Sequence, residues 1–277
     1  MDTIQIMENI GICIYSYQNK NLFKTVSEII DKSSQKNMLY FYIIDQNSVD
    51  RTRSLDQPDF YASIVYKYVT WDSIKSPIEY KQDAFKSLNK KYYMQIGDDV
   101  SLAKDWDIHA VEFLKNNKNS ILSGNSTVTL KNKNWFMLEP ERVPSANFNK
   151  INYIDRNFIF ALSEDFAIIN QPTHLKYCGE EESISIDLIN SGVDIYNFPD
   201  EYISINKNSV EDKYTPFSLT HNYNQFIEKY SNEIQKNFNI NLMQLPFEDN
   251  DVAYDTGQSQ IDRMGGLRYL DRIKEIR

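Results

Sequence analysis

Residues 92–107 have the sequence YYMQIGDDVSLAKDWD, and this stretch indicates both a fold and a site. It begins with a mainly apolar run of the length of a buried β-strand, and Gly97, Asp98 and Asp99 follow as a turn. Two carboxylates at a strand end can dock a hard divalent cation such as Mg2+ or Mn2+, which completes its shell with phosphate and water. The alternative is a solvated acidic turn, because turns favour Asp.

The sequence around this stretch alternates strand and helix patterns. Apolar runs predict four strands in the first hundred residues, at 9–17, 39–44, 64–69 and 92–96. Apolar residues at helical spacing predict helices at 22–30 and 80–88. Because ligands of open α/β sheets bind outside the carboxyl ends of the strands, we expect the polar residues after three of these strands to converge on one crevice: 17–19, 45–46 and 97–99.

The second half continues with shorter elements. A helix is predicted at 107–114, and short strands are predicted at 121–124, 158–162, 165–169 and 193–199. Residues 180–191 predict a helix whose first turn carries three glutamates, which complement the helix dipole. A polar stretch at 247–260 reads as a linker to a mixed-charge C-terminal helix. The whole pattern predicts an α/β fold with a central sheet flanked by helices.

Composition excludes several classes of protein. The chain has 277 residues, 41% of them hydrophobic, and a formal net charge of −9 without any block of five basic residues, which argues against a nucleic-acid surface. Neither a G-x-G-x-x-G nor a Walker motif occurs. Cys13 and Cys178 have no metal-type spacing, and the longest apolar stretch, 38–44, is far below the ~18 residues of a membrane span. We expect a soluble, cytoplasmic protein.

Four strings of sequence carry a family resemblance when they are taken in order. They are GICIYSY at 11–17 with IDQ at 44–46, YYMQIGDD at 92–99 with DWD at 105–107, NFIFA at 157–161, and the segment 179–199, which begins GEE and ends at a proline. Over about residues 9–200 the chain resembles GT-A-fold glycosyltransferases, and more narrowly the polypeptide N-acetylglucosaminyltransferase-like (GlcNAc transferase) family.

The resemblance implies a GT-A-like fold with a mixed central sheet. Its domain would span 1–248, with a nucleotide-binding half at 1–107, an acceptor-binding half at 108–248 and a tail at 249–277. The implied activity is metal-dependent transfer of a sugar, such as GlcNAc or glucose, from a UDP-sugar to a hydroxyl group of a protein, a glycan or a modified DNA base. Mn2+ or Mg2+ would be the cofactor.

The metal site departs from the family pattern. Where the family has Asp-Ser-His, this chain has Gly97-Asp98-Asp99, so Asp99 is expected to be the main metal ligand. Asp98 is expected to be a second ligand or to contact the ribose. His221 is the candidate to replace the missing histidine, although a lone histidine is more often structural.

Other residues are assigned to the donor by their place in the strand pattern. Tyr17, Gln18 and Asp45 follow strands and are expected to meet uracil and ribose, unless they are polar strand ends without a ligand. Lys81 lies where the family carries a basic residue, so it would contact the diphosphate or brace Asp98, although helix lysines are usually solvated. Trp106 fits packing as well as sugar stacking.

Glu180 and Glu181 are the candidates to face the acceptor hydroxyl. One of them would act as general base if the enzyme inverts configuration. The resembling family retains configuration, in which case these acids would orient the acceptor or the sugar. Two other functions stay open: a catalytically inactive nucleotide-sugar or glycan-binding module, and a metal-dependent hydrolase, which would need histidines at ligand spacing that this chain lacks.

Overall fold

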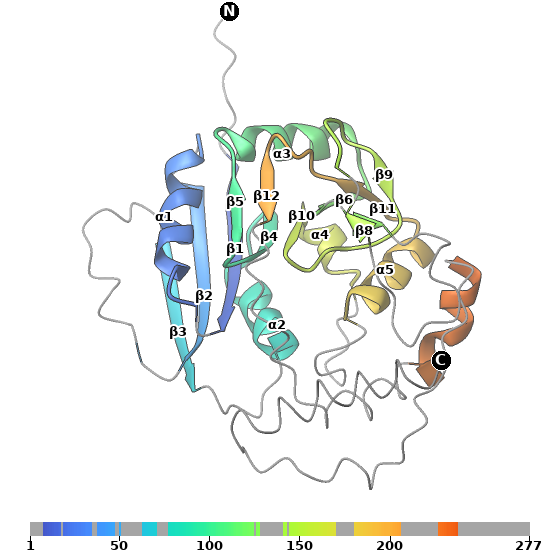
Figure 1. Ribbon diagram of the computed structural model, residues 1–277, viewed down its shortest axis with the longest axis horizontal. Helices are drawn as coiled ribbons and strands as arrows, with labels where there is room; N and C mark the ends of the chain where they lie inside the picture. The colour runs from blue at the N-terminus through green and yellow to red at the C-terminus, as the bar shows by residue number, and fades with distance from the viewer. Residues whose placement is uncertain are drawn as a thin grey trace, which may run out of the picture.

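The computed structural model describes residues 8–17, 19–34, 38–47, 50, 63–70, 77–124, 126–127, 141–142, 144–169, 180–205 and 227–237. These residues build an eight-stranded mixed sheet with helices on both of its faces (Figure 1). The strand order is β3-β2-β1-β4-β10-β6-β11-β9. The predicted linker and C-terminal helix lie outside the described residues.

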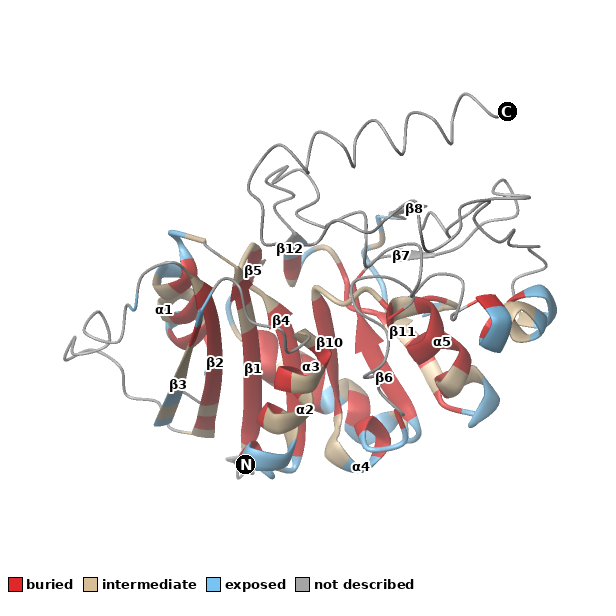
Figure 2. Ribbon diagram, turned by 90° about the horizontal axis from the view of Figure 1, so that it is seen from below, coloured by how far each residue is buried: buried red, intermediate tan, exposed pale blue. Residues whose placement is uncertain are grey.

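The first half of the sheet is parallel. The strands are β1 (Ile10–Tyr17), β2 (Leu39–Asn47), β3 (Ser63–Thr70) and β4 (Tyr92–Gly97), and the helices between them are α1 (Leu22–Lys32) and α2 (Pro77–Leu88). This order confirms the strands and helices predicted for the first hundred residues. Figure 2 shows β1, β2 and β4 mostly buried, whereas β3 at the edge is largely intermediate or exposed. Burial on both faces explains the continuous apolar runs of the central strands.

The second half is mixed. It contains β5 (Val100–Leu102), α3 (Trp106–Asn116), β6 (Ser120–Ser123), β9 (Lys150–Ile151), β10 (Phe158–Leu162), α4 (Ser163–Phe166), α5 (Glu180–Asn190) and β11 (Asp194–Asn197). Strand β10 runs antiparallel to both β4 and β6. Two small sheets pair β5 with β12 (Ile203–Ile205) and β7 (Ser126–Thr127) with β8 (Glu141–Arg142).

The strand predicted at 165–169 is wrong, because the chain turns into the short helix α4 after β10. Ser163 begins this helix, and its hydroxyl donates a hydrogen bond at 2.6 Å to the carbonyl of Lys90, which lies in the connection between α2 and β4. The helix ends at Phe166, and the apolar residues after it form a turn and pair with no strand.

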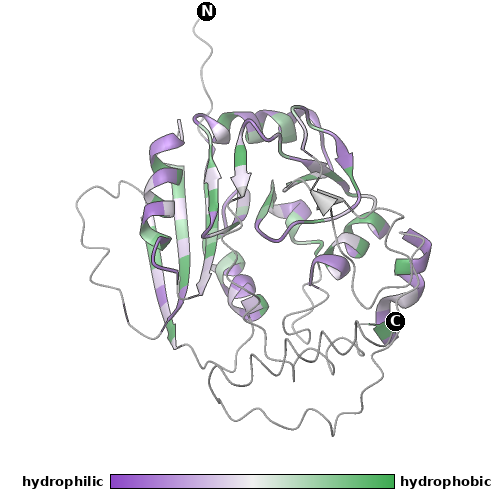
Figure 3. Cartoon of the chain, viewed as in Figure 1, coloured by the Kyte–Doolittle hydropathy of each residue, from purple (hydrophilic) through white to green (hydrophobic). Residues whose placement is uncertain are grey.

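The core consists of one hydrophobic cluster on each face of the sheet. Ile10, Ile12 and Ile14 of β1 face the cluster that contains α1 and α3, whereas Cys13 faces the cluster that contains α2, α4 and α5. The helices α1, α2 and α5 carry both hydrophilic and hydrophobic residues, as expected for helices that cover a sheet (Figure 3). In the described ranges, no helix is long and apolar enough to cross a membrane.

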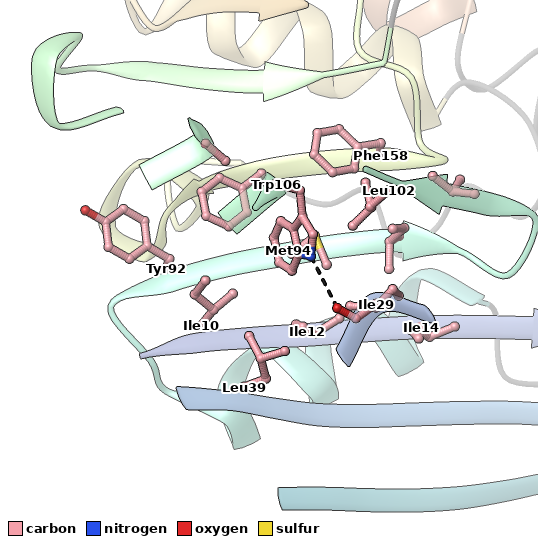
Figure 4. Close-up of a cluster of buried hydrophobic side chains, with 14 of the residues drawn as sticks. Ile10, Ile12, Ile14, Ile29, Leu39, Tyr92, Met94, Leu102, Trp106 and Phe158 are labelled. Carbon is pink, nitrogen blue, oxygen red and sulfur yellow. Dashed lines mark hydrogen bonds between the residues drawn. The ribbon is translucent and has the colours of Figure 1, made fainter. Parts of the chain in front are cut away.

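Trp106 belongs to this core. Its side chain is fully buried, and its indole N–H donates to the carbonyl of Ile29 in α1 at 3.3 Å (Figure 4). The packing interpretation of Trp106 therefore holds, since a buried ring is closed to a sugar. Next to it, the buried carboxylate of Asp107 accepts hydrogen bonds from the hydroxyl of Ser33 at 2.7 Å and the backbone N–H of Ser34 at 3.1 Å.

Candidate functional site

The acidic turn lies between β4 and β5, and α1 holds it through the backbone. The carbonyl oxygen of Asp98 accepts hydrogen bonds from the Thr25 hydroxyl at 2.9 Å and from the Asn19 amide at 3.3 Å. After the turn, the Ser101 hydroxyl receives a hydrogen bond from the Lys32 ammonium at 3.0 Å. The turn therefore has a fixed position against the first helix.

Gly97 leaves room for the carboxylate of Asp99. A Cβ at Gly97 would lie 2.8 Å from Oδ1 of Asp99 and 3.3 Å from Oδ1 of Asn157, closer than ordinary carbon–oxygen contacts. The side chain of Asp99 thus folds back over Gly97. Burial raises the pKa of Asp99, and the charges of Asp98 and Asp155 raise it further. A cation at this point would stabilise the charged carboxylate of Asp99 and so lower its pKa.

A second turn, Asp155–Asn157, lies directly beside the first. Because β10 is antiparallel to β4, the residues before β10 lie next to the carboxyl end of β4. The backbone N–H of Gly97 donates to the carbonyl of Asn157 at 2.8 Å, and the Gln95 amide donates to the carbonyl of Arg156 at 3.3 Å. The predicted site did not include this turn. Three polar residues directly before an apolar strand were the available signal.

The first turn of α5 carries three glutamates in three different environments. Glu180 is buried and accepts a hydrogen bond from the ammonium of Lys81 on α2 at 2.9 Å. Glu181 is partly exposed, and its Oε1 lies 3.4 Å from Nε of Arg156. Glu182 is buried, and burial together with the charge of Glu181 raises its pKa to about 8, against a smaller opposing hydrogen bond from Tyr153.

Glu181 and Asp99 share the same charged neighbours. Burial raises the pKa of Glu181, Glu180 and Asp155 raise it further, and Arg156 and Lys81 lower it. Asp155 and Arg156 also act on Asp99. The Asp155–Asn157 turn therefore lies between the acidic turn and the start of α5. The sequence predictions assign the acidic turn to the donor side and the start of α5 to the acceptor side.

The ends of β1, β2 and β4 meet at one edge of the sheet, as predicted. Ser16 is in register with Asp45, and Tyr15 with Gly97. Asp45 is fully buried, and its Oδ2 accepts a hydrogen bond from the hydroxyl of Tyr66 on β3 at 2.7 Å. Tyr17 ends β1 and is half-buried.

The remaining predicted residues divide into two groups. Lys81 is described, and the structure brings it to Glu180 rather than to Asp98; nothing in the sequence links these two residues, which are 99 positions apart. Gln18 and His221 lie outside the described residues.

The donor set at the acidic turn suits a hard cation. Among the described residues, no group of three or more His, Cys, Asp or Glu side chains is arranged to hold a metal ion. Asp98 and Asp99 supply carboxylate oxygens, and Mg2+ in phosphate-transfer sites is commonly held by one or two carboxylates together with substrate phosphates. The residues therefore fit a cation that shares its coordination with a diphosphate.

Comparison with known proteins gives matches only among solved structures, since no family model and no curated protein sequence matches the chain. A structure of GalNAc-T7 with UDP, GalNAc and Mn2+ superposes with a TM-score of 0.62 at 12% identity, over 83% of this chain and 50% of that one. S. aureus TarS gives 0.57 at 12% identity, over 88% and 41%. TarS 1-349 with UDP-GlcNAc gives 0.56 at 10% identity, over 88% and 69%.

These similarities establish the class of fold. The chain has the GT-A fold of glycosyltransferases, as the sequence predicted. It spans about half of the GalNAc-T7 chain and 41% of the full TarS chain. The neighbours support the GT-A part of the resemblance, whereas the narrower likeness to the polypeptide N-acetylglucosaminyltransferase-like family stays a prediction.

Proposed function

We propose that the chain is a metal-dependent glycosyltransferase that moves a sugar from a UDP-sugar to a hydroxyl acceptor. The observation that carries this proposal is the meeting of two acidic segments at the carboxyl edge of a GT-A sheet, with Arg156 between them. GalNAc-T7 was solved with UDP and Mn2+, and TarS with UDP-GlcNAc, which supports a UDP-sugar as donor. The likeness to the polypeptide N-acetylglucosaminyltransferase-like family favours GlcNAc or glucose as the sugar.

On the donor side, Asp99 and Asp98 would hold Mn2+ or Mg2+, with His221 as a further candidate ligand. The metal would neutralise the negative charge that develops on the departing UDP. Tyr17, Gln18 and Asp45 would meet the uridine. Asp45 lies in register with Ser16 at the strand ends, where its buried carboxylate accepts a hydrogen bond from the Tyr66 hydroxyl.

On the acceptor side, Glu181 is favoured over Glu180. Glu180 is buried in an ion pair with Lys81, so its carboxylate is committed to holding α5 against α2. We accordingly give Lys81 a bracing role in place of contact with the diphosphate. Glu181 keeps part of its surface exposed, and burial raises its pKa, which suits a base that takes the acceptor proton. In a retaining reaction it would orient the acceptor.

The test is a donor screen that measures UDP release by the full chain with Mn2+ and UDP-GlcNAc, UDP-glucose, UDP-GalNAc or UDP-galactose, each with and without hydroxyl acceptors. We expect release that depends on both metal and acceptor. UDP binding without turnover of any donor would indicate an inactive binding module. UDP release at a rate that does not depend on the acceptor would indicate a hydrolase.

Variants at α5 test the acceptor assignment. Glu181→Gln should lower transfer by roughly 100-fold or more while the affinity for UDP is retained, because the amide keeps the size of the side chain and loses its basicity. Transfer rates and calorimetric UDP affinities of the same preparations decide the matter. The assignment is wrong if UDP affinity collapses in Glu181→Gln while transfer from bound donor is normal.

A further inference from the structure

Among the described residues, Lys81 and Arg156 are the cations that act on the acids at this edge of the sheet, and they differ in accessibility. Lys81 is 7% exposed and is enclosed in its ion pair with Glu180. The side chain of Arg156 is 34% exposed, and its Nε lies 3.4 Å from Oε1 of Glu181. Arg156 also lowers the pKa of Asp99. Of these two cations, Arg156 is therefore the one that an incoming anion can reach.

The backbone of Arg156 is fixed, so an exchange of its partner involves its side chain. Its carbonyl accepts from the Gln95 amide, and the backbone N–H of Asp155 donates to the Ser123 hydroxyl at 2.7 Å. A Cβ at Gly124 would lie 2.8 to 3.0 Å from three side-chain atoms of Asp155, so the glycine allows the turn to pack closely against the end of β6. The guanidinium is thus carried by a rigid turn between Asp99 and Glu181.

We infer that Arg156 binds the diphosphate of the donor, and that in doing so it leaves Glu181 and makes that carboxylate available to the acceptor. This inference rests on the proposed function. A guanidinium presents a planar fork that matches phosphate oxygens, and a diphosphate carries more negative charge than one carboxylate. Donor bound at Asp98 and Asp99 therefore competes with Glu181 for Arg156. The donor binds first, and the acceptor meets a Glu181 freed of its ion pair.

The first part of the test measures UDP affinity by calorimetry with Mn2+ on the full chain. Arg156→Gln should weaken UDP binding by about 10- to 100-fold, the range expected for hydrogen bonds to charged groups. Arg156→Lys should recover only part of the loss, because an ammonium lacks the fork. The matched control is Lys67→Gln: Lys67 is 36% exposed and paired with Asp83 at 3.8 Å, and its loss should leave UDP affinity unchanged.

The second part tests release of Glu181. Glu181→Gln should bind UDP several-fold tighter than the wild type, because Arg156 no longer has to leave a partner. In the double variant with Arg156→Gln, this gain in UDP affinity should vanish. A purely structural ion pair would not produce this pattern of affinities. Melting temperatures verify folding, and Arg156→Lys carries the test if Arg156→Gln does not fold.

Each outcome has a definite meaning. A wild type that does not bind UDP overturns the proposed function and this inference with it. A wild type that binds UDP while Arg156→Gln binds equally well overturns the inference alone. Weakening of UDP binding by Glu181→Gln to the same extent as by Arg156→Gln overturns the release step, since the pair would then be needed intact.

Discussion

The two acidic segments of the site are held in opposite ways. The Asp98–Asp99 turn is anchored through a backbone carbonyl, which accepts hydrogen bonds from Thr25 and Asn19. The first turn of α5 is anchored through its carboxylates, which reach Lys81, Arg156 and Tyr153. When a segment is fixed by its backbone, its side chains remain available to bind a ligand. When a segment is fixed by its side chains, those side chains already serve the fold. Glu181 is the exception, because its partner is accessible.

The two segments also differ in how far their acidic side chains are already neutralised. Asp99 is raised in pKa by burial and by two like charges, and Arg156 is the cation that opposes them. Glu180 already has a buried ammonium at 2.9 Å, and Glu182 has a pKa of about 8 that favours its neutral form. An added cation therefore gains most at the acidic turn, which is where we assign the metal.

The largest expected effect is on stability, when the buried ion pair between Lys81 and Glu180 loses its lysine. Lys81→Met should lower the free energy of unfolding by about 3–5 kcal/mol, because it leaves the carboxylate of Glu180 buried and unpaired. The matched control is Lys67→Met, whose pair with Asp83 is about one third exposed and should contribute less than about 1 kcal/mol. Chemical denaturation measures both.

A double variant sharpens this prediction. Replacing Lys81 and Glu180 together by Met removes both charges and should restore most of the stability lost in Lys81→Met. If the single variant is as stable as the Lys67→Met control, the pair is not buried in solution and the contrast between the two segments fails.

The next largest effect is at the acidic turn. Asp99→Asn should reduce donor turnover by about 100-fold or more, since charge neutralisation by a metal is worth several kcal/mol. Stability should change little, because the turn is held through the backbone of Asp98. Steady-state turnover at several Mn2+ concentrations measures the loss, and Asp98→Asn should lose less. The reverse ranking would show that the two acids are assigned backwards.

A smaller effect is a pH dependence that arises in α5. The pKa of Glu182 in the folded protein, about 8, lies above its ordinary value of 4.5, so the folded state holds the proton more tightly. Stability should therefore fall as pH rises from about 5 to about 8, by up to about 1.4 kcal/mol per pH unit. Glu182→Gln should flatten this slope and be more stable than the wild type at pH 8, whereas Glu112→Gln on the exposed surface of α3 should keep the slope. Equal slopes in wild type and Glu182→Gln would contradict a buried, protonated carboxyl.

The smallest effect concerns the backbone anchor itself. Thr25→Val removes one hydrogen bond to the carbonyl of Asp98 and should cost about 1 kcal/mol of stability. Turnover should fall by a few-fold, because the turn loses part of its support. The comparison is Thr70→Val at the exposed end of β3, which should change neither quantity. A Thr25→Val variant indistinguishable from that control would mean that the Thr25 hydrogen bond does not support the turn.

The predictable part of this molecule is the part that depends on local pattern. Apolar runs identified β1, β2 and β4, and the rule that parallel strands end at one edge brought Asp45 and the acidic turn together. Arg156 and the pairing of Lys81 with Glu180 were missed because they depend on tertiary contacts: Arg156 with Glu181, 25 positions away, and Lys81 with Glu180, 99 positions away. The strand prediction at 165–169 was wrong because the chain turns into α4 directly after β10, which the short apolar run does not reveal.

A calorimetric titration of UDP into the full chain, with and without Mn2+, separates the wild type from Asp99→Asn. Mn2+ should strengthen UDP binding to the wild type, and Asp99→Asn should lose most of this strengthening while keeping its melting temperature. Absence of UDP binding to the wild type, or equal metal-dependent binding by both proteins, would contradict the assignment of this edge of the sheet to a UDP-sugar.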